Sequence, residues 1–188
     1  MLPELSDRRG ERRGLTEGER RLAASIFGTA LDPHAVEVRR WAWWALQGRE
    51  WVMAPAGHLH FHAKGSGWSA DFAAESVPLQ AFFLHELTHV WQHQRGVNLI
   101  LRRHPFCRYR YRLERGRRFT DYGLEQQGEI VRHAHLLRHG YAVPGNPPRA
   151  AYEALLADAF AKPLRADPRS AWSKWIGRFG ARLRGVRD

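Results

Sequence analysis

The segment His85–His89 reads His-Glu-Leu-Thr-His, with two histidines four residues apart and Glu86 directly after the first. On an α-helix, four residues turn about 400° and rise about 6 Å, so both imidazoles project from one face with Glu86 on its flank. Zinc binds nitrogen and oxygen ligands at about 2.0–2.2 Å and keeps one position for water in catalytic sites. The spacing therefore predicts that His85 and His89 bind Zn²⁺ and that Glu86 accepts a proton from an activated water.

The surrounding residues favour a continuous helix that carries this motif. The stretch 79–95 contains no glycine or proline, Ser76 and Pro78 provide start signals, and Gly96 provides a stop. An apolar stripe recurs along it at helical spacing, formed by Phe83, Leu84, Leu87, Val90 and Trp91. The alternative, a helix that exposes its histidines to solvent, does not account for this stripe or for the acidic pattern downstream.

A zinc site in a protein needs at least one further ligand besides the two histidines. His93 lies two turns beyond the first histidine, and ligands at i, i+4 and i+8 would span about 12 Å on a straight helix, too far for one ion. The segment 124–131 offers Glu125 and Glu129 one turn apart, and Gly128 between them permits close approach of a second helix. Either glutamate is a candidate ligand. The alternative is a solvated helix face, which glutamates commonly occupy.

The two motifs together, H-E-x-x-H and an E-x-x-G-E element that begins 36 residues after His89, resemble the gluzincin branch of the zincin metallopeptidases. The resemblance implies that Glu125 is the third zinc ligand and that Glu129 orients a zinc-bound histidine. An aspartate is usual at the latter position, and Glu129 supplies the same carboxylate with one more methylene of reach. The resemblance also implies an α+β, zincin-like fold, with a small, mostly antiparallel sheet packed on the active-site helix and a second ligand-bearing helix.

A narrower resemblance extends over residues 14–140. The stretch His85–Gln92, together with the segments 15–20, 53–58 and 72–74, resembles the bacterial Vgr-related proteins and a metallopeptidase domain associated with contractile injection systems. It implies a peptide or protein substrate and association with a protein of a contractile, type VI-like secretion apparatus. A non-catalytic zincin-fold adaptor or assembly protein of that apparatus is the competing hypothesis.

The mechanism also needs a donor for the oxyanion that develops on the substrate carbonyl. Proximity in the sequence makes Tyr111, Tyr122 and His133 the candidates. His133 is preferred because it lies two turns beyond Glu125 on the same helix face.

The composition is strongly basic, with a net charge of +11 over 188 residues. Such a surface attracts nucleic acid, anionic lipid or acidic proteins. Arginine far outnumbers lysine, so a biased coding composition explains much of the charge, and a basic nucleic-acid-binding protein is the third hypothesis. The lone Cys107 excludes an intramolecular disulfide. We find no signal-peptide or membrane-spanning pattern and expect a cytoplasmic protein that an injection apparatus could export.

We expect three parts along the chain. Residues 1–14 are predicted to form a disordered basic N-terminus, 15–143 the metallopeptidase domain, and 144–188 a helical extension. The extension should contain a helix near 149–161 and a basic amphipathic helix that could contact an anionic surface, with its apolar face formed by Trp172, Trp175, Ile176, Phe179 and Leu183.

Within the domain, Thr16 and Glu19 predict a capping box for a helix that ends at Gly28. Alternating residues predict a short strand at 36–39, and the segments 51–53 and 58–62 predict two further strands joined by a turn. By resemblance, the strand 58–62 would lie antiparallel to a bound peptide. Three ligands along one strand span about 13 Å, so a second metal site is not expected at its histidines, His58, His60 and His62. These histidines should line the cleft or face solvent, with His60 as a substrate contact. The segment 97–123 is expected to form an irregular lid.

Overall fold

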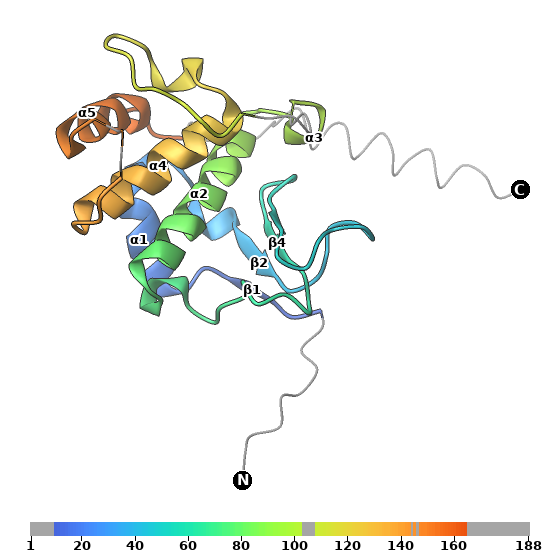
Figure 1. Cartoon of the computed structure of the whole chain (residues 1–188). Helices are drawn as coiled ribbons and strands as arrows, with labels where there is room; N and C mark the ends of the chain where they lie inside the picture. The colour runs from blue at the N-terminus through green and yellow to red at the C-terminus, as the bar shows by residue number, and fades with distance from the viewer. Residues whose placement is uncertain (1–9, 103–107, 144, 146, 165–188) are drawn as a thin grey trace, which may run out of the picture.

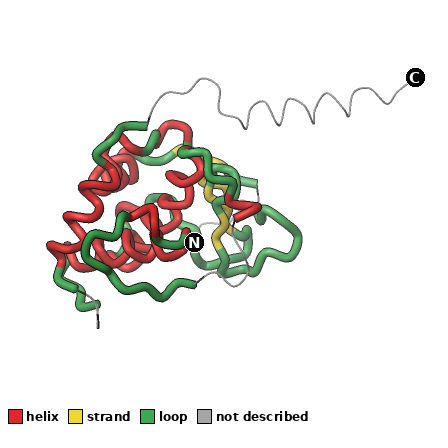
Figure 2. The backbone as a smooth tube through the Cα atoms, turned by 90° about the horizontal axis from the view of Figure 1, so that it is seen from above, coloured by secondary structure: helices red, strands yellow, loops and turns green. Residues whose placement is uncertain are grey.

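The computed structural model describes residues 10–102, 108–143, 145 and 147–164. The helices within these ranges are α1 (Glu17–Phe27), α2 (Val77–Gln94), α3 (Leu99–Arg102), α4 (Leu124–Arg138) and α5 (Arg149–Phe160). The strands are β1 (Arg12–Gly14), β2 (Glu37–Arg39), β3 (Val52–Met53) and β4 (Leu59–Phe61). The predicted α+β class is confirmed, and the helices gather on one side of the molecule with the sheet on the other (Figures 1 and 2). The predicted amphipathic helix at 172–183 lies outside the described residues.

The four strands form a mixed sheet in the order β1-β2-β4-β3. β1 pairs with β2 and β3 pairs with β4 in antiparallel fashion, whereas β2 and β4 run parallel. The expectation that the segment 58–62 pairs with a bound peptide is wrong, because β4 has a neighbour on each side and its backbone groups face those neighbours. The outer strand on this side is β3, whose unpaired edge is the one that could accept another chain.

The N-terminal part of the domain begins earlier than predicted. Arg12–Gly14 form β1 rather than part of a disordered tail, because they pair with Glu37–Arg39. The Arg13 guanidinium also donates to both carboxylate oxygens of the buried Glu19, at 2.7 and 2.8 Å. The predicted capping box at Thr16 and the end of α1 at Gly28 are confirmed.

The core joins α2, α4 and α5 to α1 and the sheet. All five residues of the predicted apolar stripe on α2 are buried. The ring of Phe160, on α5, packs against three other rings, those of Phe27, Trp91 and Phe119. The first helix of the predicted extension, α5, packs on the domain, because it buries Tyr152, Leu156 and Phe160 in the same core. Within the described residues, no helix is long and apolar enough to cross a membrane.

The histidines of the β4 region do not line a cleft together. His60 is 1% exposed and packs edge-on against the rings of Trp41 and Trp43. His58 accepts a hydrogen bond through Nδ1 from the backbone N–H of Glu37, at 3.3 Å. The expectation that His60 contacts substrate is wrong, because aromatic packing encloses its ring.

Buried histidines make the stability of the fold depend on pH. Burial, with the nearby charges of His139 and Arg138, lowers the pKa of His135 to about 4, and burial likewise lowers that of His60 to about 4. The unfolded chain holds these protons near pH 6.5, so it binds more protons than the folded chain between pH 6.5 and 4. The free energy of unfolding should therefore fall as the pH decreases through this window.

We predict that His135→Asn flattens this dependence, because it removes one titrating group. The slope should decrease by at most about 1.4 kcal/mol per pH unit. Urea denaturation of both proteins at pH 6.5, 5.5 and 4.5 measures the two slopes. Equal slopes in the wild type and the variant would contradict the assignment.

Candidate metal centre

The centre forms where α2 and α4 approach each other closely. Gly128 makes this approach possible, because a Cβ atom at this position would lie 2.7 Å from Cε1 of His85 and 2.8 Å from both of its ring nitrogens. The predicted role of Gly128 in close helix approach is confirmed. α4 begins at Leu124, where the side chain of Gln126 accepts a hydrogen bond from the backbone N–H of Gly123.

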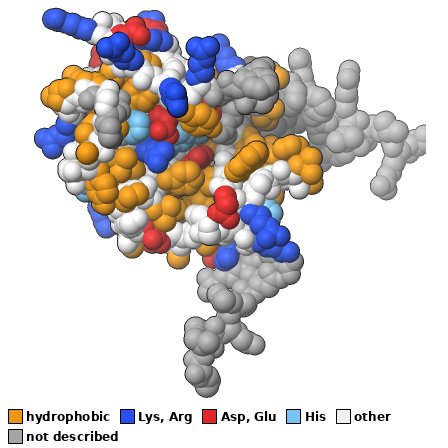
Figure 3. Space-filling model, viewed as in Figure 1, with side chains coloured by type: hydrophobic (Ala, Val, Ile, Leu, Met, Phe, Trp, Pro, Cys, Tyr) orange, Lys and Arg blue, Asp and Glu red, His pale blue; other side chains and the backbone are white. Residues whose placement is uncertain are grey.

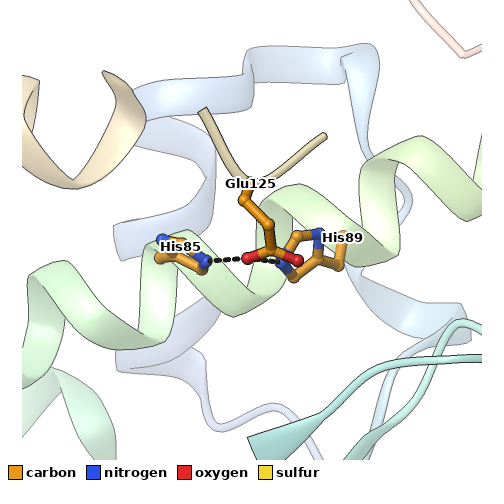
Figure 4. A group of neighbouring side chains, drawn as sticks. All are labelled: His85, His89 and Glu125. Carbon is orange, nitrogen blue, oxygen red and sulfur yellow. Dashed lines mark ion pairs between the residues drawn. The ribbon is translucent and has the colours of Figure 1, made fainter. Parts of the chain in front are cut away.

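Glu125, on α4, faces both histidines of α2 (Figure 4). Its Oε2 lies 3.4 Å from Nε2 of His85 and 3.4 Å from Nε2 of His89. One ligand atom from each of the three residues lies within 4.8 Å of the others, and all three side chains are buried. The structure thus brings together the three residues that the sequence predicted as metal ligands. It is the one such group within the described ranges.

Glu129 lies behind His85, as the resemblance implied. Its Oε1 is 3.0 Å from Nδ1 of His85, on the opposite side of the ring from Glu125. Burial lowers the pKa of His85, but hydrogen bonds to Glu125 and Glu129 and the charge of Glu86 outweigh it and raise the pKa to about 9. The carboxylates therefore favour a positive charge at this place. In a metal complex, the ring would donate Nδ1–H to Glu129 and leave Nε2 for the ion.

His89 presents Nε2 in the same direction, and this buried atom has no hydrogen-bond partner among the described residues. Its other nitrogen, Nδ1, is 2.9 Å from Oε1 of Gln92. The contact of Gln92 with His89 was not predicted from the sequence. The signal that could have identified it is its position three residues after His89, which places the two side chains on neighbouring parts of one helix face.

Glu86 also lies at the centre. It is 4% exposed, and its charge acts on His85. Two nitrogens and one carboxylate oxygen from the protein match a catalytic zinc site of the two-histidine, one-glutamate type, which leaves a position for water. The residues present therefore fit a zinc ion, with Glu86 beside it.

The three candidates for the oxyanion donor are placed elsewhere. His133 directs Nδ1 to the hydroxyl of Tyr111, at 2.6 Å, and Nε2 toward Glu129, at 3.4 Å, so it stands behind His85. The Tyr111 hydroxyl also contacts that of Tyr152, at 2.8 Å. The Tyr122 hydroxyl accepts a hydrogen bond from the backbone N–H of Glu114, and the Arg117 guanidinium lies over the Tyr122 ring. Neighbouring protein groups engage all three side chains, so the preference for His133 gains no support from the structure.

A fourth aromatic residue, Tyr109, lies beside one of the ligands. The ring of Tyr109 stacks on that of His85, with ring centroids 6.4 Å apart, and its side chain is 51% exposed. Tyr109 falls within the segment expected to form a lid, and a residue in a segment without periodicity gives no sign of where its side chain points.

Comparison with known proteins identifies a related sequence and a related solved structure. The type VI secretion system spike protein VgrG2b of Pseudomonas aeruginosa is 44% identical to this chain over 128 residues. The match covers 64% of this chain and 12% of VgrG2b. The solved structure of the effector domain of VgrG2b superposes with a TM-score of 0.60 at 36% identity, and the match covers 86% of this chain and 87% of that domain. The chain is homologous to the VgrG2b effector domain. No family model matches the chain.

The resemblance to Vgr-related proteins rested on short motifs. The homology to the VgrG2b effector domain covers most of the described fold. The match to the VgrG2b effector domain covers 86% of the chain, more than the segment 14–140 on which the resemblance was based. The chain spans about an eighth of the length of VgrG2b itself.

We predict that Gly128→Ala displaces His85. Alanine improves helix propensity by about 1 kcal/mol, but its Cβ would overlap a buried ring, and overpacking typically costs about 1–3 kcal/mol. The displaced ring should also bind metal more weakly, which a zinc titration against a chromophoric chelator would measure. Gly14→Ala is the matched control, because a Cβ there meets nothing within 4 Å. Unchanged zinc affinity in Gly128→Ala would contradict the close-approach argument.

Proposed function

We propose that this chain is a zinc-dependent peptidase domain that acts as a type VI secretion effector. The observation that carries the proposal is the convergence of His85, His89 and Glu125 on one buried point, with Glu86 beside it. Two helices distant in sequence supply these residues, and a glycine permits their contact. A solvated helix face would not bury two histidines and two glutamates together.

The proposed metal is Zn²⁺, and His85, His89 and Glu125 would hold it. When bound, zinc supplies a Lewis acid that lowers the pKa of a water molecule and polarises the substrate carbonyl. A site of two histidines and one carboxylate is typical of zinc hydrolases. Softer sites rich in thiolate are excluded here because the chain has one cysteine.

The side chains of the centre divide the proton chemistry between them. Glu86 takes a proton from the attacking water and later delivers it to the leaving amine of the cleaved peptide bond. Glu129 accepts the Nδ1–H of His85 and so keeps Nε2 of that ring available as a ligand. The buried position of Glu86 keeps its carboxylate next to the reacting atoms rather than in bulk water.

Tyr109 is our proposed contact for the developing oxyanion, in place of His133. Its ring lies against a ligand, its side chain is about half exposed, and its phenol can donate a hydrogen bond. An exposed residue over a buried ligand is positioned to meet substrate arriving from solvent.

The secretion role rests on the homology to the VgrG2b effector domain, which is part of a type VI spike protein. We propose that this chain is likewise delivered by such an apparatus and acts on a protein or peptide. In this proposal, the basic surface would contact protein partners after delivery. Binding of nucleic acid by that surface is the third hypothesis.

We predict that Glu86→Gln abolishes peptide hydrolysis and leaves zinc bound. The amide cannot accept the proton, and general base catalysis typically contributes a factor of about 10²–10⁴. The measurement is turnover of casein or a peptide library, together with metal content after purification without chelator. Full activity in the variant would rule out this role.

The same assays separate the peptidase from a non-catalytic adaptor. Stoichiometric zinc in the wild type together with cleavage of a substrate supports the peptidase. Stoichiometric zinc with no cleavage of any substrate in the library would instead favour the adaptor.

We predict that Tyr109→Phe lowers kcat while zinc affinity stays unchanged, because the ring remains and the hydroxyl is lost. Removal of one oxyanion donor costs a factor of about 10²–10³ in kcat. Tyr141→Phe is the matched control, because Tyr141 is similarly exposed and lies beyond the end of α4. A kcat equal to that of the control would contradict the assignment.

A further inference from the structure

Gln92 lies behind the second histidine of the centre and is 1% exposed. Its side chain makes three hydrogen-bond contacts: Oε1 with Nδ1 of His89 at 2.9 Å, and Nε2 with the backbone oxygen of Leu124 at 3.0 Å and Oε1 of Gln127 at 2.9 Å. Gln127 in turn donates from Nε2 to the backbone oxygen of Tyr122, at 2.8 Å. Two buried amides thus form a chain from His89 to the first turn of α4.

Two backbone oxygens determine the direction of every hydrogen bond between these amides. The backbone oxygens of Tyr122 and Leu124 can only accept, so the groups that face them must be the NH₂ ends of Gln127 and Gln92. Gln127 then turns its oxygen toward Gln92, which donates a second proton to it. Reversing either amide would bring two acceptors together in a buried place, which costs about 1–3 kcal/mol.

This leaves Gln92 with its oxygen facing His89. An oxygen whose amide is oriented in this way can only accept, so Nδ1 of His89 must carry the proton. A neutral imidazole with Nδ1–H has its lone pair on Nε2, the atom that points toward Glu125 and His85. The wrong tautomer would place a proton where the metal must bind.

We propose that Gln92 is a positioning residue that fixes the metal-binding tautomer of His89, with Gln127 holding Gln92 in orientation. The inference rests on the proposed metal site and extends it. It means that the two histidines are oriented by different chemistry: a carboxylate, Glu129, for His85 and a chain of neutral amides for His89. The amide chain also ties α2 to the residue before Glu125, through the oxygen of Leu124.

The test compares two substitutions at the same position. Gln92→Met keeps the length of the side chain but removes the acceptor, and loss of such an outer partner typically weakens metal binding by about 10–100-fold. Gln92→Glu keeps an acceptor for Nδ1–H, as Glu129 provides for His85, but cannot donate to Leu124 or Gln127. Zinc affinity of Gln92→Glu should remain within about threefold of the wild type or become tighter, although its melting temperature falls.

Zinc dissociation constants are measured by competition with a chromophoric chelator, on protein shown to be folded by circular dichroism. The matched control is Gln94→Met, because Gln94 lies on the same helix and bonds to the backbone of Asp32, away from the centre. Wild-type affinity is expected for Gln94→Met.

The outcomes separate this inference from the proposed function. If Gln92→Met binds zinc as tightly as the wild type, or if folded Gln92→Glu loses as much affinity as Gln92→Met, the positioning role is overturned while the metal site stands. If Gln92→Met does not fold, Gln92→Glu decides alone, since a folded Gln92→Glu that has lost zinc contradicts the tautomer argument. Wild-type protein that binds no zinc overturns the proposed function and this inference with it.

Discussion

The contact between Gly128 and the ring of His85 is the constraint on which the centre depends. A glycine inside a helix costs about 1 kcal/mol relative to alanine, and α4 carries it at the point of closest approach to α2. Because no Cβ intervenes, the ring of His85 can approach the backbone of α4 closely, with one nitrogen near Glu125 and the other near Glu129. Two carboxylates one turn apart on α4 can therefore reach opposite edges of a single imidazole.

The contact between Gly128 and His85 also brings acidic groups close together in a largely buried region. The buried Glu86 and Glu125 and the partly exposed Glu129 surround His85, and buried carboxylates are costly unless a positive charge is close. The raised pKa of His85, about 9, is the response of the protein alone to this charge, because a proton on the ring balances part of it. A divalent cation would balance it more fully. The carboxylates that destabilise the metal-free fold are therefore the groups that would couple metal binding to folding.

Local spacing predicted His85 and His89 on α2 and placed two candidate glutamates on α4, and the resemblance to gluzincins implied that Glu125 was the ligand of the two. Local spacing also predicted the capping box of α1 and the turn before β4. It failed where long-range pairing decides the outcome. β1 becomes ordered through contact with β2, and β4 lies inside the sheet because of a parallel pairing that no local pattern encodes. The positions of Gln92 and Tyr109 likewise depend on which segments meet at the centre.

Polar contacts also connect α5 to the centre. The acid behind His85 contacts His133, His133 contacts the Tyr111 hydroxyl, and that hydroxyl contacts Tyr152 on α5. A ligand of the proposed metal is thereby linked through polar contacts to a helix that begins at Arg149. Because Tyr152 is fully buried, its hydroxyl needs a polar partner, and Tyr111 supplies it. The polar chain and the apolar core therefore hold α5 in place from two sides, and the orientation of His85 depends on both.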